Sequence, residues 1–109
     1  ICAPTMVSEL KDGVVTSYTI EPEDFGLPRG DIADIVVADP AASLAMIDNV
    51  FTGQQGAARD IVVMNAGAGI YVSGLADSLA KGISMAAEAI DSGRAQQVKL
   101  DYVRATQDA

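Results

Sequence analysis

Apolar and polar residues alternate along the first part of the chain. Residues 6–10 read Met-Val-Ser-Glu-Leu, and most of residues 14–20 are β-branched or aromatic, which is the pattern of half-buried strands. The Asp12-Gly13 pair between the two runs is typical of a tight hairpin turn, because glycine adopts positive φ angles at no steric cost. The sequence therefore predicts a β-hairpin within residues 1–20.

From residue 39 onward the apolar residues recur every three or four positions, which predicts helices. Asp39 followed by Pro40 is a helix-start signal, because the carboxylate can cap free N–H groups and proline suits the first helical position. Gly53 marks the expected end of this helix. Its expected core-facing stripe consists of Leu44, Ile47, Val50 and Phe51.

Three further helices are predicted, over residues 57–72, 77–91 and 94–105. The first of them is apolar on nearly every side, which indicates a buried helix. The next has a regular stripe and ends at a stop signal, Gly93. The stripe of that helix is Leu79, Ile83, Ala86 and Ile90.

The connector over residues 21–38 carries fewer signals. Pro22 and the acidic residues that follow it indicate about one helical turn, which Phe25 and Leu27 would dock on the core. Residues 31–37 fit either a short strand or an extended loop, and the sequence leaves both readings open.

Several surfaces of the two predicted strands and four predicted helices have no other predicted element to pack against. A lone hairpin is marginal in water and needs a third strand or a helical cover. A helix that is apolar all round needs neighbours on every side. We therefore expect a piece of a larger α/β domain, with exposed apolar faces and an open sheet edge that promote self-association.

Composition excludes several classes of function. The net charge of −8 argues against binding to nucleic acid or to an anionic membrane surface, since both require a basic footprint. The chain has no histidine and one cysteine, Cys2, which excludes histidine-based catalysis and an internal disulfide framework. No run resembles a secretion signal. We expect a cytoplasmic protein, and the start at Ile1 suggests a processed or truncated one.

The most distinctive small motif is Asn65-Ala66-Gly67-Ala68-Gly69. It could be a dinucleotide-binding turn, but the third glycine of that fingerprint is absent, because position 72 is Val. The favoured interpretation is that these small residues let a second helix approach closely.

The remaining polar residues are interpreted as structural. The acids Glu21, Glu23, Asp24, Asp31, Asp34 and Asp39 are predicted to be solvated or to cap helices. The basic residues Lys11, Arg29, Arg59, Lys81, Arg94, Lys99 and Arg104 are predicted to lie on the surface, and Asp60 to favour a helix N-terminus. No hydroxyl or thiol has a base beside it in the sequence, so we assign no catalytic, substrate-binding or metal-ligating residue.

Several longer segments nevertheless resemble one enzyme family, in the family's order and across nearly the whole chain. They are Ala3-Pro4-Thr5, Glu9-Leu10, Asp12-Gly13, Pro22-Glu23-Asp24-Phe25-Gly26-Leu27, Arg59-Asp60-Ile61-Val62, Asn65-Ala66, Tyr71-Val72, Ala76-Asp77-Ser78-Leu79 and Glu88-Ala89-Ile90-Asp91-Ser92-Gly93. Together they resemble the C-terminal third of anthranilate phosphoribosyltransferase.

The resemblance implies an α/β fold and a parent enzyme, with magnesium as cofactor, that transfers phosphoribose from phosphoribosyl pyrophosphate to anthranilate in tryptophan biosynthesis. It also implies a homo-oligomer. The family's Gly-Thr-Gly-Gly, Asn-x-Ser-Thr and Asp-Glu motifs do not occur here, so no site residue carries over and we expect this piece to be inactive alone.

We therefore predict that residues 1–109 form the C-terminal portion of the catalytic α/β domain. Residues 1–38 would be hairpin and connector, and residues 39–105 a helical layer. Three alternatives stay open: a non-enzymatic interaction module that self-associates, a nucleotide-binding module built on residues 65–69, and a relative of the same fold that acts on another phosphoribosyl acceptor.

Overall fold

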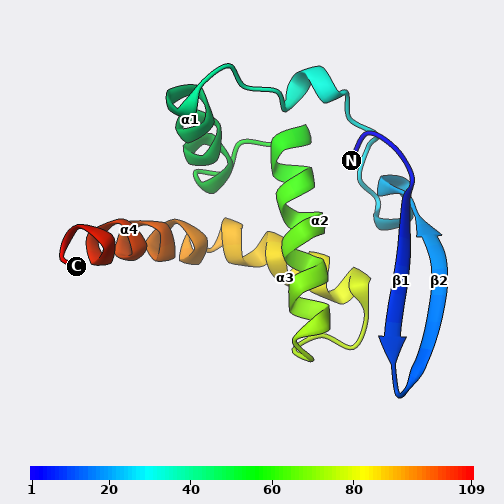
Figure 1. Cartoon of the computed structure of the whole chain (residues 1–109). Coiled ribbons are helices and arrows are strands. Elements are labelled where there is room, and N and C mark those ends of the chain that lie inside the picture. The colour runs from blue at the N-terminus through cyan, green and yellow to red at the C-terminus, as the bar shows by residue number, and fades with distance from the viewer.

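The structure is a computed structural model that describes all residues, 1–109. Two antiparallel strands are followed by two short 3₁₀ turns and four α-helices (Figure 1). In chain order the elements are β1 (Thr5–Lys11), β2 (Val14–Ile20), η1 (Pro22–Phe25), η2 (Ile32–Asp34), α1 (Pro40–Phe51), α2 (Ala57–Val72), α3 (Leu79–Asp91) and α4 (Arg94–Gln107). The predicted hairpin and four helices are confirmed.

The hairpin closes through the predicted Asp-Gly turn. Asp12 and Gly13 have φ angles of 52° and 78°, as a two-residue turn requires when it matches the twist of its strands. Lys11 pairs with Val14, and the register continues regularly to Thr5 opposite Ile20. The sheet has only these two strands, so each strand keeps one free edge.

The connector contains two tight turns and no strand. The predicted helical turn is η1, and Phe25 and Leu27 pack against the core as expected. Of the two readings for residues 31–37, the strand is wrong, because residues 32–34 form η2. The Asp31 carboxylate accepts a hydrogen bond from the Ala33 N–H at 2.9 Å, which satisfies a backbone donor locally and favours the turn over a strand.

Helix α1 begins as predicted but buries less than predicted. Asp39 Oδ1 accepts a hydrogen bond from the Ala42 N–H at 2.7 Å, and Pro40 is the first helical residue. Val50 is buried and Phe51 packs against the core. Leu44 and Ile47 are exposed, so the expected core-facing stripe is wrong for its N-terminal half, because no other element of the chain covers that face.

The tightest packing in the molecule is between α2 and α3, which cross at a pair of glycines. A Cβ on Gly82 would lie 2.2 Å from the Gly67 carbonyl oxygen, and one on Gly67 would lie 2.6 Å from the Ile83 Cα. Around this crossing the core is a single cluster of five buried residues: Val50, Val63, Ile83, Ala86 and Ile90. Residues without Cβ atoms therefore allow the backbones to touch.

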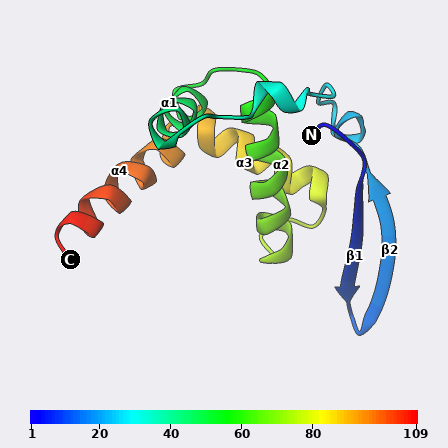
Figure 2. The ribbon, with the colours of Figure 1, turned by 45° about the horizontal axis from the view of Figure 1, so that its top comes forward.

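Helix α4 projects away from the other helices toward the C-terminus (Figure 2). It has no buried residue, and an ion pair between Lys99 and Asp48 ties it to α1. The predicted apolar side of this helix is largely exposed at Val98 and Tyr102.

The chain is more open than a closed domain of its size. Its radius of gyration is 15.3 Å, against about 13 Å for a compact domain of this length. Its accessible surface is 7120 Å², against about 5,700 Å² for a folded monomer of this mass. Only 11 of the 109 residues are buried, so the exposed apolar faces expected from the sequence are present.

Candidate functional site

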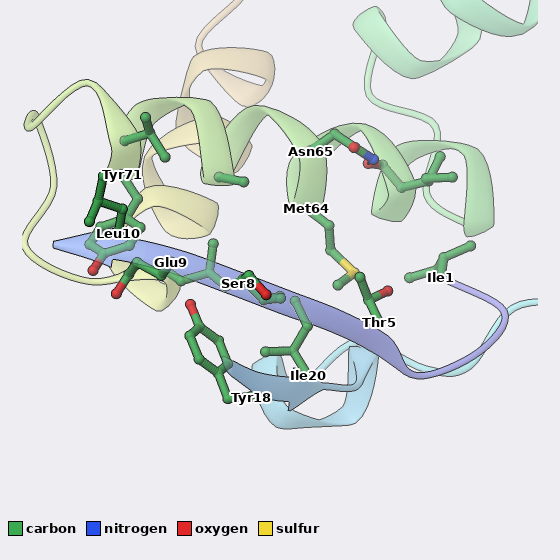
Figure 3. Close-up of a pocket in the computed structure, with 15 residues that line it drawn as sticks. Ile1, Thr5, Ser8, Glu9, Leu10, Tyr18, Ile20, Met64, Asn65 and Tyr71 are labelled. Atoms are coloured by element: carbon green, nitrogen blue, oxygen red, sulfur yellow. The ribbon is translucent and has the colours of Figure 1, made fainter. Parts of the chain in front are cut away.

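The largest apolar hollow near the strands is a groove between the hairpin and α2, with a volume of about 580 Å³ (Figure 3). We call it the hairpin groove. It is lined by Ile1, Thr5, Val7, Ser8, Glu9, Leu10, Tyr18, Ile20, Ile61, Met64, Asn65, Ala68, Tyr71, Val72 and Leu79. Eleven of these 15 residues are hydrophobic, so the groove suits an apolar occupant better than a polar one.

Each wall of the groove is one face of a regular element. On the hairpin, Val7 lies opposite Tyr18 in the strand register, and both line the groove. On α2, Ile61, Met64 and Ala68 follow one another at helical spacing, and the Met64 side chain points toward β1 (Figure 3). This side of α2 lies next to the face that packs at the glycine crossing, since Met64 also packs against the core, and Val72 at the end of the helix is 83% exposed.

The polar residues of the groove lie along its whole length, from Thr5 at the open end of the hairpin to Glu9 near the turn. Burial raises the pKa of the Tyr18 hydroxyl, and the nearby Glu9 and Tyr71 raise it further, so Tyr18 stays neutral at physiological pH. The Lys11 ammonium lies 5.7 Å from the centre of the Tyr71 ring, a cation–π distance that links the hairpin to α2. No lysine or arginine lines the groove itself, which makes it unlike a site for phosphate groups.

The motif at residues 65–69 lies in the middle of α2. The Asn65 side-chain nitrogen donates a hydrogen bond to the Ile61 carbonyl oxygen at 2.9 Å, and Gly67 is at the helix crossing. The packing interpretation is therefore confirmed, and the dinucleotide-binding turn is wrong, because such a turn requires glycines in a loop before a helix rather than within one.

The prediction that Arg59 lies on the surface is wrong. Its side chain is 8% exposed, and Nη1 lies 2.9 Å from Asp91 Oδ1, while Nη2 donates to Asp91 Oδ2 at 3.1 Å. The two residues belong to α2 and α3, so this ion pair, with a hydrogen bond from Nη2, joins the crossing helices. The sequence offered one overlooked signal: Arg59 lies four and eight positions before Val63 and Gly67, on the same buried face.

Asp60 lies in the first turn of α2, as predicted. It is also buried, which the sequence reading missed. Burial raises the pKa of its carboxyl group, while the neighbouring Arg59 charge opposes that rise. Burial therefore disfavours the charged form of Asp60, and the positive charge of Arg59 offsets part of that cost.

Most of the other acids act as the sequence predicted. Asp31 and Asp39 cap their turns, and Asp24 Oδ2 accepts a hydrogen bond from the Glu21 N–H at 2.8 Å. Glu23 accepts hydrogen bonds from Arg29 at 2.9 and 3.0 Å, which lowers the pKa of Glu23. No three acidic or cysteine side chains come together in a way that could hold a metal ion.

None of the helices is both long enough and apolar enough to cross a lipid bilayer.

The α/β architecture matches a known class of enzymes. The model of the glycosyl transferase family a/b domain matches residues 1–96. The chain therefore belongs to this glycosyl transferase family.

The individual relatives are anthranilate phosphoribosyltransferases, which confirms the resemblance drawn from the sequence. The enzyme of Thioalkalivibrio sulfidiphilus is 58% identical over 97 residues, which are 89% of this chain and 29% of the relative. The enzyme of Ruthia magnifica is 44% identical over 108 residues, which are 99% of this chain and 32% of the relative.

Among solved structures, the crystal structure of anthranilate phosphoribosyltransferase from Thermus thermophilus matches with a TM-score of 0.75 and 30% identity. That match covers 81% of this chain and 27% of the Thermus chain. The chain thus spans somewhat under a third of the relatives that it matches.

Proposed function

We propose that this chain is the C-terminal portion of an enzyme that transfers phosphoribose from phosphoribosyl pyrophosphate to the amine of anthranilate, in tryptophan biosynthesis. The bond from the ribose carbon to pyrophosphate breaks, a bond to the amine nitrogen forms, and the nitrogen loses a proton. The observation that carries this proposal is the 58% identity to the Thioalkalivibrio enzyme over 89% of the chain.

Within that enzyme the chain acts as scaffold. The crossing of α2 and α3 supplies a rigid core, and the hairpin groove offers an apolar face to the rest of the protein. Stabilising a pyrophosphate leaving group requires cations and backbone donors, and the groove lining supplies neither lysine nor arginine. In this proposal the residues that react with the substrates and bind the magnesium ion lie outside this chain. The proposal also includes a cytoplasmic location and a homo-oligomeric enzyme.

A second candidate is an interaction module that acts by self-association. The observation in its favour is the accessible surface of 7120 Å², which exceeds that of a compact monomer by about 1,400 Å². Sedimentation equilibrium of the 109-residue chain separates the two: a discrete dimer of fixed stoichiometry favours the module, and open-ended association that grows with concentration favours a scaffold whose exposed faces meet the rest of a longer enzyme.

A chimaera tests the scaffold proposal directly. The segment of the Thioalkalivibrio enzyme that matches this chain is replaced by the chain itself, and the loss of anthranilate in the presence of phosphoribosyl pyrophosphate and magnesium is measured. We expect turnover within roughly tenfold of the unmodified enzyme, because 58% identity preserves the packing positions.

Two controls accompany the chimaera. The Thioalkalivibrio enzyme with the segment deleted, and the 109-residue chain alone, are both expected to be inactive. A chimaera that folds, binds phosphoribosyl pyrophosphate and uses a different amine in place of anthranilate would contradict the proposed acceptor. One that folds and transfers to no amine would contradict the proposal as a whole.

A further inference from the structure

The tip of the hairpin places an aspartate directly before a glycine. Of the eleven aspartates in the chain, only Asp12 precedes a glycine, Gly13. Both residues are exposed, and the turn projects past the helices in both views of the molecule (Figures 1 and 2). Glycine has no Cβ to shield its backbone nitrogen, so the Gly13 nitrogen is sterically free to approach the Asp12 carboxyl group.

Asp12 also differs from most other aspartates because its carboxylate has no partner within the chain. Six aspartates accept a hydrogen bond or form an ion pair, and these are Asp24, Asp31, Asp39, Asp48, Asp91 and Asp101. Asp60 is buried. The neighbouring Lys11 ammonium lies over the Tyr71 ring rather than on Asp12. No contact within the chain therefore holds the Asp12 side chain away from its own backbone.

The backbone of the turn is open as well. Asp12 is the only residue other than glycine with a positive φ angle, 52°, and a residue with a Cβ adopts this left-handed conformation at an energetic cost. A Cβ added to Gly13 would meet no atom within 4 Å, and the Gly13 N–H donates no hydrogen bond to a backbone carbonyl. The Gly13 nitrogen is thus unshielded and unpaired, and the turn has room for a ring at this position.

We propose that Asp12 is a modification site, at which the chain isomerises spontaneously to isoaspartate and the hairpin turn opens. The Gly13 nitrogen attacks the side-chain carboxyl carbon of Asp12 and loses its proton, and the carboxyl hydroxyl leaves as water, which closes a cyclic succinimide. Water then adds to the main-chain carbonyl carbon of Asp12, whose bond to the Gly13 nitrogen breaks. Water is released and taken up again, so the product has an unchanged mass. The proposal does not depend on the proposed function.

Isoaspartate conflicts with the geometry of the hairpin. The main chain of the product runs through the side-chain carboxyl group of Asp12 and is longer by one carbon atom. A two-residue turn matches the twist of its strands only with its normal chain length, and the Lys11–Val14 pair beside the turn depends on that match. We expect this pair to open and the contact of Lys11 with Tyr71 to be lost, while the crossing of α2 and α3 stays intact.

Ageing of the 109-residue chain at neutral pH tests the proposal. Isoaspartate is measured by peptide mapping and by methylation with an isoaspartyl methyltransferase and labelled S-adenosylmethionine. Asp77 is the internal reference, because it is exposed and precedes Ser78. We expect isoaspartate to form at Asp12 at least roughly tenfold faster than at Asp77, because only Gly13 lacks a Cβ. Equal rates at the two aspartates would overturn the proposal.

The same measurement in urea tests whether the folded turn leaves the site open. We expect the rate at Asp12 in the folded chain to lie within roughly tenfold of the rate in the unfolded chain, because an exposed turn opens at little cost in free energy. A folded chain that isomerises much more slowly than this would overturn the proposal, because it would show that the hairpin protects Asp12.

A matched variant and the isomerised product complete the test. Asp12→Glu keeps the charge but would have to close a larger ring, so we expect methylation of the aged turn to disappear, and methylation equal to that of the parent chain would overturn the assignment to Asp12. In the isomerised fraction we expect the Val14 amide to exchange at least roughly tenfold faster than in the unmodified chain, with the Ile83 amide unchanged. Unchanged exchange at Val14 would overturn the proposed opening of the turn.

Discussion

The α2–α3 crossing and the hairpin differ in what holds them in place. At the crossing, buried aliphatic side chains, two glycines in backbone contact and the Arg59–Asp91 ion pair act together. The hairpin is held by its own strand pairing and by the cation–π contact of Lys11 with Tyr71, while Met6 is 88% exposed. The crossing is complete within this chain, whereas the hairpin has its second face open.

The difference shows that a sequence can specify regular secondary structure without also providing the residues that cover it to form a core. Turn chemistry and alternation are enough to specify a hairpin, but a two-stranded sheet gains independent stability only when its apolar face is covered. In this chain an open groove separates the hairpin from α2, so the apolar face of the hairpin is not packed into the core.

The largest expected effect comes from adding a methyl group at the crossing. Gly82→Ala would place a Cβ 2.2 Å from the Gly67 carbonyl oxygen, which forces the two helices apart. We expect the free energy of unfolding to fall by about 3 kcal/mol, as measured by urea denaturation followed by circular dichroism.

The matched control for that variant is Gly69→Ala on the open side of α2, where a Cβ would meet nothing within 4 Å. This substitution should raise the free energy of unfolding by roughly 0.5–1 kcal/mol, because alanine favours a helix over glycine. If the two variants shift stability in the same direction, the crossing is not the tight contact described.

The next effect concerns the ion pair between α2 and α3. Arg59→Met keeps most of the side-chain volume and removes the guanidinium group, and Asp91 is 58% exposed, so water can solvate its carboxylate. We expect a loss of about 1–2 kcal/mol by thermal denaturation. As a control, Arg104→Ala breaks the exposed ion pair with Asp101 on α4 and should lower the free energy of unfolding by less than about 0.5 kcal/mol. Comparable losses of stability in the two variants would argue against a buried pair between Arg59 and Asp91.

A smaller, pH-dependent effect is expected at Asp60. Burial raises the pKa of its carboxyl group above the ordinary value of 3.8, so the folded chain holds that proton more tightly than the unfolded chain. The contribution of Asp60 to stability is therefore largest below pH 3.8 and falls as the pH rises through the raised folded pKa. Asp60→Asn should be more favourable relative to the parent chain at about pH 7 than at about pH 3, as measured by urea denaturation.

Glu23→Gln should change the pH dependence of stability in the opposite direction to Asp60→Asn. Hydrogen bonds from Arg29 lower the pKa of Glu23, so its stabilising contribution is present above the unfolded pKa and is lost as the pH falls through the folded one. The glutamine variant should therefore be less favourable relative to the parent chain at about pH 7 than at about pH 3. Two parallel pH profiles would contradict both assignments.

The smallest effect is expected in the hairpin. Met6→Ala removes a side chain that is 88% exposed, and it should change the free energy of unfolding by less than about 0.5 kcal/mol. Ile90→Ala in the core, where the residue is 4% exposed, should cost about 2–4 kcal/mol by the same denaturation assay. A large loss for Met6→Ala would mean that the hairpin already has a covered face.

Features set by neighbouring residues could be predicted from the sequence. The Asp12-Gly13 turn, the Asp39-Pro40 helix start and the Gly93 stop depend on backbone angles and short-range hydrogen bonds, and all three were correct. The small residues at 65–69 were also correctly interpreted as a packing surface, because the dinucleotide fingerprint lacks its third glycine.

Features that depend on distant elements could not be predicted in the same way. Arg59 is buried because Asp91, 32 positions later, lies across from it, and nothing beside Arg59 in the sequence indicates that partner. Leu44 and Ile47 are exposed although their spacing is that of a buried stripe, because periodicity reports which face is apolar and not whether that face is covered.

The central claim is that the crossing is a finished core and the hairpin an unfinished surface, and hydrogen exchange on the 109-residue chain alone tests it most directly. We expect the amides at the centres of α2 and α3 to exchange only through global unfolding, and the hairpin amides of Val7 and Glu9 to exchange through local opening of much lower free energy. Equal protection of the helix and hairpin amides would contradict the claim, because it would mean that the strands and the helices unfold as one unit.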